Sequence, residues 1–269
     1  MALLKVDHHS EVLRFGMTMN VILPEKNIST RIGENGWKKT GGIPVLWLLH
    51  GLGGDHTNFC RYTNIERYVS ALGIAVVMPN TAQGRYTDMV DGYDFYTYLT
   101  EELRNIVYDM FPRLSKARED NFVAGVSLGG FGAYKMALDK PEHFSASASL
   151  SGVMNINALW EQQKDNASYV RGAQLVYGSP QQVTGSINDL VCQMEYRIQE
   201  QSILPRFYME CGSNDFMYPI NHDFKERFSS LVDLTWYEEP GNHDWAYWDK
   251  GLQRMLAWLS LEKQEETHG

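Results

Sequence analysis

The sequence predicts an α/β fold, in which a mostly parallel central sheet carries helices on both faces. Apolar runs with the length of strands alternate along the chain with segments of helical periodicity, which is the pattern of doubly wound sheets. The runs at 43–49 and 74–78 are apolar almost throughout, as expected of strands buried on both faces. No internal repeat or low-complexity linker divides the chain, so we expect residues 1–269 to form a single domain.

The first predicted elements lie at the N-terminal end. Residues 11–23 alternate roughly between apolar and polar side chains and predict one or two antiparallel edge strands with one face toward solvent. The polar segment 25–42 is rich in Gly and Lys, lacks a GxxxxGK[ST] phosphate-binding pattern and is expected to be a solvated connection. A central strand at 43–49, a helix at 64–72 and a second buried strand at 74–78 follow.

The middle of the chain carries further strand and helix signals. We expect a loop at 80–93, then a helix at 95–111 whose apolar face comprises Leu99, Leu103, Ile106, Val107 and Met110. A strand and a helix over 121–139 and a short strand at 144–150 come next. Residues 153–202 are more polar and only weakly periodic, so we interpret them as an insertion above the sheet that shapes the substrate pocket.

The C-terminal part completes the predicted sheet. Strands are expected at 205–210 and 234–237, with a helix at 220–231 between them and a closing helix at 245–261. Lys263–Gly269 is expected to be a frayed tail.

Composition and charge exclude several classes of function. Hydrophobic residues make up 43% of the chain and charged residues 21%, as in ordinary soluble proteins. The net charge of −9 argues against nucleic-acid binding, which needs a clustered basic surface. No apolar run has membrane-spanning length, and the N-terminus is polar too early for a signal peptide, so we expect a soluble cytoplasmic protein without membrane partners. The cysteines are too far apart for a CxxC pair or a disulfide framework: Cys60, Cys192 and Cys211.

Several residues able to carry chemistry directly follow predicted strands. They are His50-Gly51-Leu52, Ser127, Asp215 and His243. Because ligands of open parallel sheets bind at the carboxyl ends of the strands, we expect these residues to lie together at one edge.

Ser127 lies in a GxSxG pattern, Gly125-Val126-Ser127-Leu128-Gly129, between an apolar run and a predicted helix. This is the sequence of a nucleophile elbow, in which a serine occupies the tip of a sharp strand-to-helix turn. Glycine two residues to either side leaves room for the neighbouring strand and helix and tolerates unusual dihedral angles. The pentapeptide alone fits an ordinary glycine-rich turn equally well, so a nucleophilic role for the serine depends on further residues elsewhere in the chain.

A serine nucleophile needs a base and an orienting carboxylate. Of the eight histidines, His243 follows a strand late in the chain, which satisfies the order Ser, Asp, His of α/β-hydrolases. His50 is better explained as a structural residue that orients the glycine-rich loop after it. Asp215 is the preferred carboxylate because it ends the strand unit before the one that carries His243. The other carboxylates are less well placed, in a helix, in the insertion or beside the histidine: Asp223, Asp189 and Asp244.

The tetrahedral intermediate of acyl transfer needs hydrogen-bond donors for its oxyanion. The backbone N–H of Leu128, directly after the serine, is one expected donor. The second is the N–H of Leu52, since the loop Gly51–Gly54 can fold its amides inward. The candidate wall residues of the pocket, each of which would also fit in the core, are Phe59, Tyr86 and Trp245.

Five sequence blocks in a fixed order extend this pattern over most of the chain. They are PVLWLLHGLGGDHTNF (44–59), VVMPNTAQGRYTD (76–88), FVAGVSLGGFGAYKMAL (122–138), CGSNDFMY (211–218) and PGNHDWAYW (240–248). With them, the sequence resembles the esterase D-like branch of the α/β-hydrolases, and within it the bacterial tributyrin esterases, from about residue 11 to 260.

The resemblance implies an α/β-hydrolase fold and a serine carboxylesterase that acts on short-chain acyl esters. By it, Ser127, Asp215 and His243 form the catalytic triad, and the amides of Leu52 and Leu128 form the oxyanion hole. Acyl-enzyme chemistry of this kind needs no metal and no organic cofactor. The expected partner is a small-molecule ester, and assembly into a homo-oligomer stays open.

Four other functions stay open. S-formylglutathione hydrolases are related, but carry a Thr-Cys-Thr type loop where this chain has Gly51-Leu52-Gly53-Gly54-Asp55. Feruloyl and acetylxylan esterases share the same frame, and so do acyltransferases of the antigen 85 type. A non-catalytic binding protein on this fold usually lacks a triad member, and none is missing here.

Overall fold

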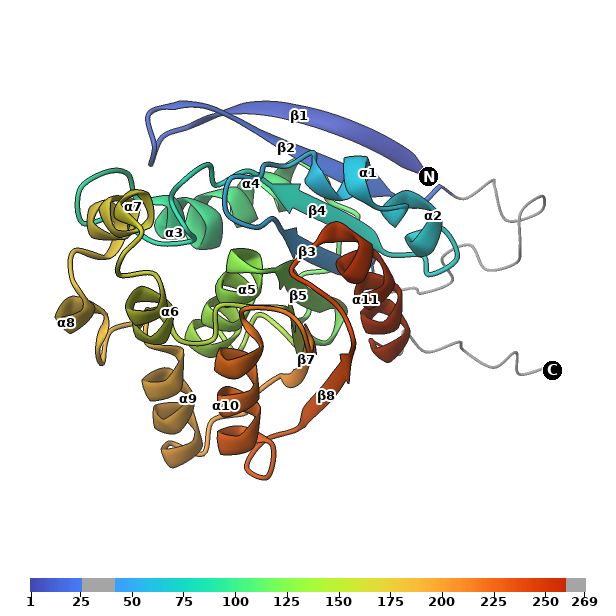
Figure 1. Ribbon diagram of the computed structural model, residues 1–269. Helices are drawn as coiled ribbons and strands as arrows, with labels where there is room; N and C mark the ends of the chain where they lie inside the picture. Colours follow the sequence, from blue (N-terminus) through green and yellow to red (C-terminus); the bar gives the residue numbers. More distant parts are fainter. Residues whose placement is uncertain (26–41, 260–269) are drawn as a thin grey trace.

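The computed structural model describes residues 1–25 and 42–259, which form one sheet flanked by helices (Figure 1). The strand order is β1-β2-β4-β3-β5-β6-β7-β8. β1 pairs antiparallel with β2, and β2 with β4, whereas every other neighbouring pair is parallel. The strands are β1 Ala2–Ser10, β2 Phe15–Leu23, β3 Val45–Leu49, β4 Ala75–Pro79, β5 Asn121–Val126, β6 Ala146–Leu150, β7 Arg206–Gly212 and β8 Leu234–Glu239.

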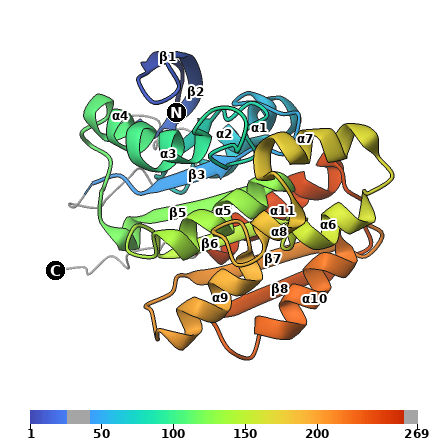
Figure 2. The same cartoon turned by 90° about the vertical axis from the view of Figure 1, so that its left-hand side faces the viewer.

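Helices cover both faces of the sheet (Figure 2). Successive residues of the central strands point to opposite faces, so that Val45, Trp47 and Leu49 join one apolar core while Leu46 and Leu48 join the other. Helices α1, α2 and α11 pack on the second core. Helices α4, α5, α6, α7, α9 and α10 pack on the first. The helices are α1 Asn58–Tyr62, α2 Ile65–Val69, α3 Phe95–Thr97, α4 Leu103–Met110, α5 Leu128–Asp139, α6 Ile156–Gln162, α7 Ala167–Tyr177, α8 Pro180–Val183, α9 Leu190–Gln199, α10 Tyr218–Phe228 and α11 Trp245–Trp258, with a π-helical turn at Tyr98–Glu102 and a 3₁₀ turn at Arg118–Asp120.

The register of the parallel strands aligns their carboxyl ends. Leu49 of β3 lies opposite Gly125 of β5, and Gly212 of β7 lies opposite Glu239 of β8. The loops that follow these strands therefore leave the sheet at one edge. The predicted α/β fold is confirmed, including the mostly parallel sheet and the helices on both faces.

The structure corrects several details of the predicted elements. The edge hairpin begins earlier than the predicted 11–23, because β1 occupies residues 2–10. The short helix α1 was not predicted. The predicted helix at 95–111 is interrupted by the π-helical turn, and Met110, expected on its apolar face, is 48% exposed. Most of the predicted connection 25–42 and the tail 263–269 lie outside the described residues.

Residues 153–202 fold as four helices, α6 to α9, between β6 and β7. Asn155, Asn166, Ser179 and Asp189 cap their N-termini with side-chain oxygens, which explains why so polar a stretch is helical. Among the described residues, no helix has the length and apolarity needed to cross a membrane. All three cysteines are free thiols.

Candidate active site

Ser127 occupies the sharp turn between β5 and α5. Its backbone is left-handed, with φ of 52°, and its N–H donates to the carbonyl of Leu150 at 2.8 Å. The flanking glycines are required by close packing: a Cβ at Gly125 would lie 2.3 Å from the backbone of Gly129, and a Cβ at Gly129 would lie 2.1 Å from the carbonyl oxygen of Leu49. The turn thus has the geometry of a nucleophile elbow.

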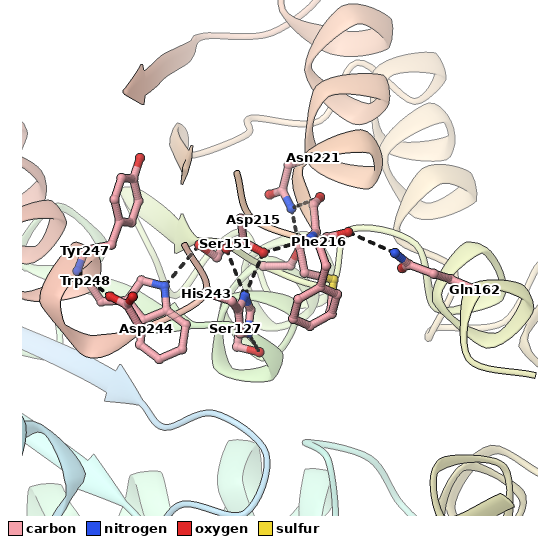
Figure 3. A network of polar contacts seen from close by, with 12 residues as sticks. Ser127, Ser151, Gln162, Asp215, Phe216, Asn221, His243, Asp244, Tyr247 and Trp248 are labelled. Carbon is pink, nitrogen blue, oxygen red and sulfur yellow. Dashed lines mark hydrogen bonds and ion pairs between the residues drawn. The ribbon is translucent and has the colours of Figure 1, made fainter. Parts of the chain in front are cut away.

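The structure brings Ser127, His243 and Asp215 together in one chain of hydrogen bonds (Figure 3). Nδ1 of His243 lies 2.9 Å from both carboxylate oxygens of Asp215, and Nε2 lies 2.9 Å from Oγ of Ser127. Since a carboxylate only accepts, Nδ1 carries the imidazole proton and Nε2 is free to accept the serine proton. The Asp215 side chain is fully buried, which shields this hydrogen bond from water.

Two aromatic rings hold the imidazole of His243 in place. The ring of Trp248 meets it edge-on at 4.8 Å, and the ring of Phe216 packs against it at 4.6 Å. Nε1 of Trp248 donates to Oγ of Ser151 at 3.0 Å, so the first of these rings is itself anchored. Together with the hydrogen bond to Asp215, these contacts restrict the orientation of the imidazole.

Backbone contacts support the loops that carry Asp215 and His243. The N–H of Asn214 donates to the carbonyl of Gly241 at 3.0 Å, and the N–H of Met217 donates to Oδ1 of Asp215 at 2.8 Å. Asp244, next to His243, points away and caps α11 by accepting from the N–H of Tyr247. The preference for Asp215 over its neighbour thus agrees with the contacts.

The loop after β3 lies beside the serine. Leu52 and Leu128 both line the same cavity as Ser127. Leu128 is the first residue of α5, so its N–H is one of those that the helix cannot satisfy internally. At Gly51, a Cβ would lie 3.5 Å from Cβ of Ser127, which shows how closely this loop approaches the elbow. Two candidate donors for an oxyanion therefore border one cavity.

His50 supports this loop from behind. It is 2% exposed, its Nδ1–H donates to the carbonyl of Gly51 at 2.8 Å, and its Nε2 accepts from the N–H of Thr81 at 3.2 Å. Burial lowers the pKa of His50, which favours the neutral imidazole that this bonding pattern requires. The contacts agree with a structural role for His50.

A cavity of about 1000 Å³ opens above Ser127 and His243. The loop after β3, helices α6 and α7, and the loops that carry Asp215 and His243 contribute to its wall. Its aromatic lining consists of Tyr62, Tyr169, Tyr177, Phe216, Trp245 and Trp248.

Of the three predicted wall residues, only Trp245 lines this cavity. The prediction is wrong for Phe59 and Tyr86, which are each 1% exposed. Phe59 lies on the buried side of α1 and packs edge-on behind Trp245, with 5.4 Å between the ring centroids. Tyr86 turns inward because its hydroxyl donates to the carbonyl of His50 at 2.6 Å. Both rings therefore support the pocket from inside.

Sequence reasoning did not identify Phe216, Trp248 or Arg85 as site residues. Phe216 and Trp248 lie in the same blocks as the acid and the base, so proximity to those motifs was the available signal. Arg85 lies in the block after β4 and lines the cavity, although it is only 6% exposed. Which way such side chains point depends on loop conformation.

Comparisons with known proteins agree with this geometry. The family model "Esterase" matches residues 10–259. An acetyl esterase from Caldicellulosiruptor saccharolyticus is 26% identical over 97% of this chain and 98% of that protein. In Staphylococcus aureus, the structure of the fluorophosphonate-binding serine hydrolase FphF is similar with a TM-score of 0.84 at 32% identity, covering 97% of this chain and 98% of FphF.

A second solved structure from Staphylococcus aureus is also similar. It is FrmB, described as an S-formylglutathione hydrolase, with a TM-score of 0.82 and 32% identity over 97% of this chain and 99% of FrmB. The chain therefore belongs to the esterase family, as a serine esterase of the esterase D-like group with the α/β-hydrolase fold.

Proposed function

We propose that this esterase hydrolyses short-chain acyl esters through an acyl-enzyme on Ser127, with His243 as general base and Asp215 as its orienting carboxylate. The observation that carries the proposal is the continuous chain of hydrogen bonds, 2.9 Å at each step, from the serine hydroxyl to the buried carboxylate. A serine hydroxyl, an imidazole and a carboxylate connected in this order are the arrangement of a Ser-His-Asp triad.

In the first half-reaction, Oγ of Ser127 attacks the ester carbonyl while Nε2 of His243 takes the hydroxyl proton. The imidazolium that forms is stabilised by the carboxylate of Asp215. When the tetrahedral intermediate collapses, the bond to the alcohol oxygen breaks, and His243 returns its proton to that oxygen. The acyl group remains on Ser127 and the alcohol leaves.

The negative oxygen of the tetrahedral intermediate is assigned to the backbone N–H groups of Leu52 and Leu128. Both residues line the cavity beside Ser127, and the second lies at the N-terminus of α5, where the helix dipole favours negative charge. Loss of one such donor typically costs about 100- to 1000-fold in kcat. Because both are backbone groups, side-chain substitution would not test them.

Water completes the reaction by the same route. His243 deprotonates it, the oxygen attacks the acyl carbonyl, and Ser127 leaves with the proton from the imidazolium. Short acyl groups are proposed on the 26% identity with an acetyl esterase. A thioester is a second candidate, because FrmB is described as an S-formylglutathione hydrolase and is 32% identical over nearly the whole chain.

We also propose that residues 153–202 are an insertion within a single domain and set the substrate range. The proposal is supported by the first two helices of this segment, which both contribute to the cavity wall. The residues are Ile156 and Leu159 of α6 and Tyr169 and Tyr177 of α7. Exchanging apolar residues here for larger ones should shorten the longest acyl chain accepted.

A fluorophosphonate probe and a panel of 4-nitrophenyl esters with increasing acyl length test the proposal. We expect wild-type protein to be labelled and to favour short chains, while Ser127→Ala loses both labelling and turnover. Ser213→Ala is the matched control, because Ser213 lies exposed at the same edge of the sheet. Labelling that survives Ser127→Ala would refute the assignment of the nucleophile. Formyl- and acetyl-thioesters in the same panel compare the thioester candidate directly.

A further inference from the structure

Arg85 places a buried positive charge in the wall of the cavity. The residue lies in the loop after β4, is 6% exposed and lines the same cavity as Ser127 and His243. Its guanidinium lies over the rings of Tyr169 and Tyr177 of α7, 5.1 and 5.9 Å from their centroids. Nη2 is 2.7 Å from the place where Gly172 would carry a Cβ, so the end of the guanidinium lies directly against α7 at its glycine.

No carboxylate of the described residues balances this charge with an ion pair. Among the described residues that line the cavity, none is Asp or Glu, although the chain has 33 acidic and 24 basic residues. Arg171 adds a second cation to the lining, on an exposed position of α7. A buried guanidinium without an anion is costly, since its five donors need acceptors and its charge needs compensation.

The hydroxyl of Tyr177 lies close to the guanidinium of Arg85. Tyr177 is 2% exposed and lines the cavity, yet its buried hydroxyl makes no hydrogen bond of normal geometry. Buried polar groups usually have a hydrogen-bond partner, so a hydroxyl of this kind in the wall of a cavity is suited to a ligand that supplies one. The guanidinium and this hydroxyl would both donate to the same anion.

The position of Arg85 is held by its backbone. Arg85 and Tyr86 both adopt positive φ, 49° and 54°, a conformation that costs non-glycine residues free energy. The carbonyl of Tyr86 accepts from the buried ammonium of Lys135 at 2.9 Å, which ties this strained segment to α5. The arginine is therefore presented by a fixed loop.

We propose that Arg85 binds a carboxylate of the substrate, so that the preferred substrates are esters that carry a carboxylate away from the scissile bond. The proposal rests on the esterase function proposed above. Arginine is suited to this role because its planar fork pairs with both carboxylate oxygens, while the stacked tyrosines keep the fork in plane. The carboxylate could stand on the acyl side or on the alcohol side of the ester.

Two substrate pairs test this, each differing only by carboxylate against primary amide. 4-Nitrophenyl hydrogen adipate and 4-nitrophenyl adipamate place the group on the acyl side; 4-acetoxybenzoate and 4-acetoxybenzamide place it on the alcohol side. The readout is the ratio of kcat/KM for the acid to that for the amide. We expect wild type to favour the acid in one pair, and Arg85→Gln to lower that ratio about 10- to 100-fold, as for loss of a charged hydrogen-bond pair.

Arg61→Gln is the matched control, because it removes the same charge from an exposed residue that lies outside the cavity lining. Arg61 is the chain neighbour of Tyr62, which does line the cavity. Its ratio should stay at the wild-type value. Arg85→Lys keeps the charge without the fork and should retain part of the preference, which secures the test if Arg85→Gln does not fold. A ratio that is unchanged in both Arg85 variants, or a wild type that does not favour either acid, would overturn the proposal. Absence of turnover and of fluorophosphonate labelling in wild type would instead refute the esterase function itself.

Discussion

Asp215→Asn tests the orientation of His243 with little change in shape. Oδ1 of Asp215 accepts from the N–H of Met217 at 2.8 Å, so the asparagine is expected to keep its oxygen on that side. Its NH₂ group then takes the position of the other oxygen, and both positions lie 2.9 Å from Nδ1 of His243, so a donor replaces one of the two acceptors of the imidazole. We expect the NH₂ group to donate to Nδ1, since the oxygen is already engaged by Met217, and this bond stabilises the tautomer that carries its proton on Nε2. In that tautomer the imidazole cannot accept the proton of Ser127.

The size of the effect follows from this exchange of tautomers. The same kind of substitution in a serine protease triad lowers kcat about 10⁴-fold. That loss corresponds to about 5.5 kcal/mol in the activation free energy. Because the substituted side chain keeps its volume and its contact with Met217, we expect the fold of the variant to survive. The residual rate should come from the oxyanion donors and from substrate binding.

The measurement is kcat for 4-nitrophenyl acetate, with thermal melting to check the fold. Asp244→Asn is the control: it removes the same charge beside His243, and asparagine caps a helix as well as aspartate does. We expect this variant to stay within about twofold of wild type, since its carboxylate only accepts from the N–H of Tyr247. If Asp215→Asn kept a tenth or more of wild-type kcat while folded, the orienting role of Asp215 would be wrong.

Three further substitutions test the packing around the site. In Gly129→Ala the new Cβ would lie 2.1 Å from a backbone oxygen of β3, so we expect the free energy of unfolding to fall by about 3 kcal/mol and the Tm by about 6 °C or more. Gly16→Ala is the control, because no atom lies closer than 3.9 Å to its new Cβ, and it should melt like wild type. Equal Tm values for the two variants would contradict the reasoning. Arg254→Met leaves the fully buried Glu210 carboxylate without its ion-pair partner, so the free energy of unfolding measured in urea should fall by about 3–5 kcal/mol. Adding Glu210→Gln should recover most of this loss, and a loss under about 1 kcal/mol would count against a buried charge at Glu210. Burial lowers the pKa of Lys135 from 10.5 to about 7, so between these values the unfolded chain binds more protons and stability rises with pH, by at most about 1.4 kcal/mol per pH unit. The free energy of unfolding of wild type relative to Lys135→Met should follow that slope, and a difference that does not change with pH would refute it.

Local signals were sufficient for the sheet and for the order of the candidate site residues. Buried parallel strands must be apolar on both faces, so β3 and β4 are recognisable as unbroken runs. Glycine is required on both sides of Ser127, because a Cβ there would lie only 2.1–2.3 Å from neighbouring atoms. This requirement is visible in the sequence as a short local pattern. The interrupted helix at 95–110 was less predictable, because a π-helical turn barely alters periodicity.

The pocket was harder to predict because loops, unlike strands, impose no periodicity on the direction of their side chains. Tyr86 and Arg85 are neighbours in one loop, yet the tyrosine turns into the core while the arginine lines the cavity. Their positive φ values decide this, and neither residue type indicates such a backbone. The same holds for Phe59, which lies one layer behind Trp245.

The sequence alone thus determined the α/β fold, the strand ends and the candidate residues Ser127, Asp215 and His243, since each depends on local pattern and on order along the chain. Tertiary structure decided which aromatic rings enclose the imidazole and that α7 lies across Arg85. Phe216 meets His243 from the loop after β7, and Arg85 meets Tyr169 from a loop more than eighty residues earlier in the chain, so neither contact is visible in a local pattern. Both exist only once the loops and α7 have packed at the edge of the sheet. The positive charge and the aromatic lining of the cavity are properties of that packing.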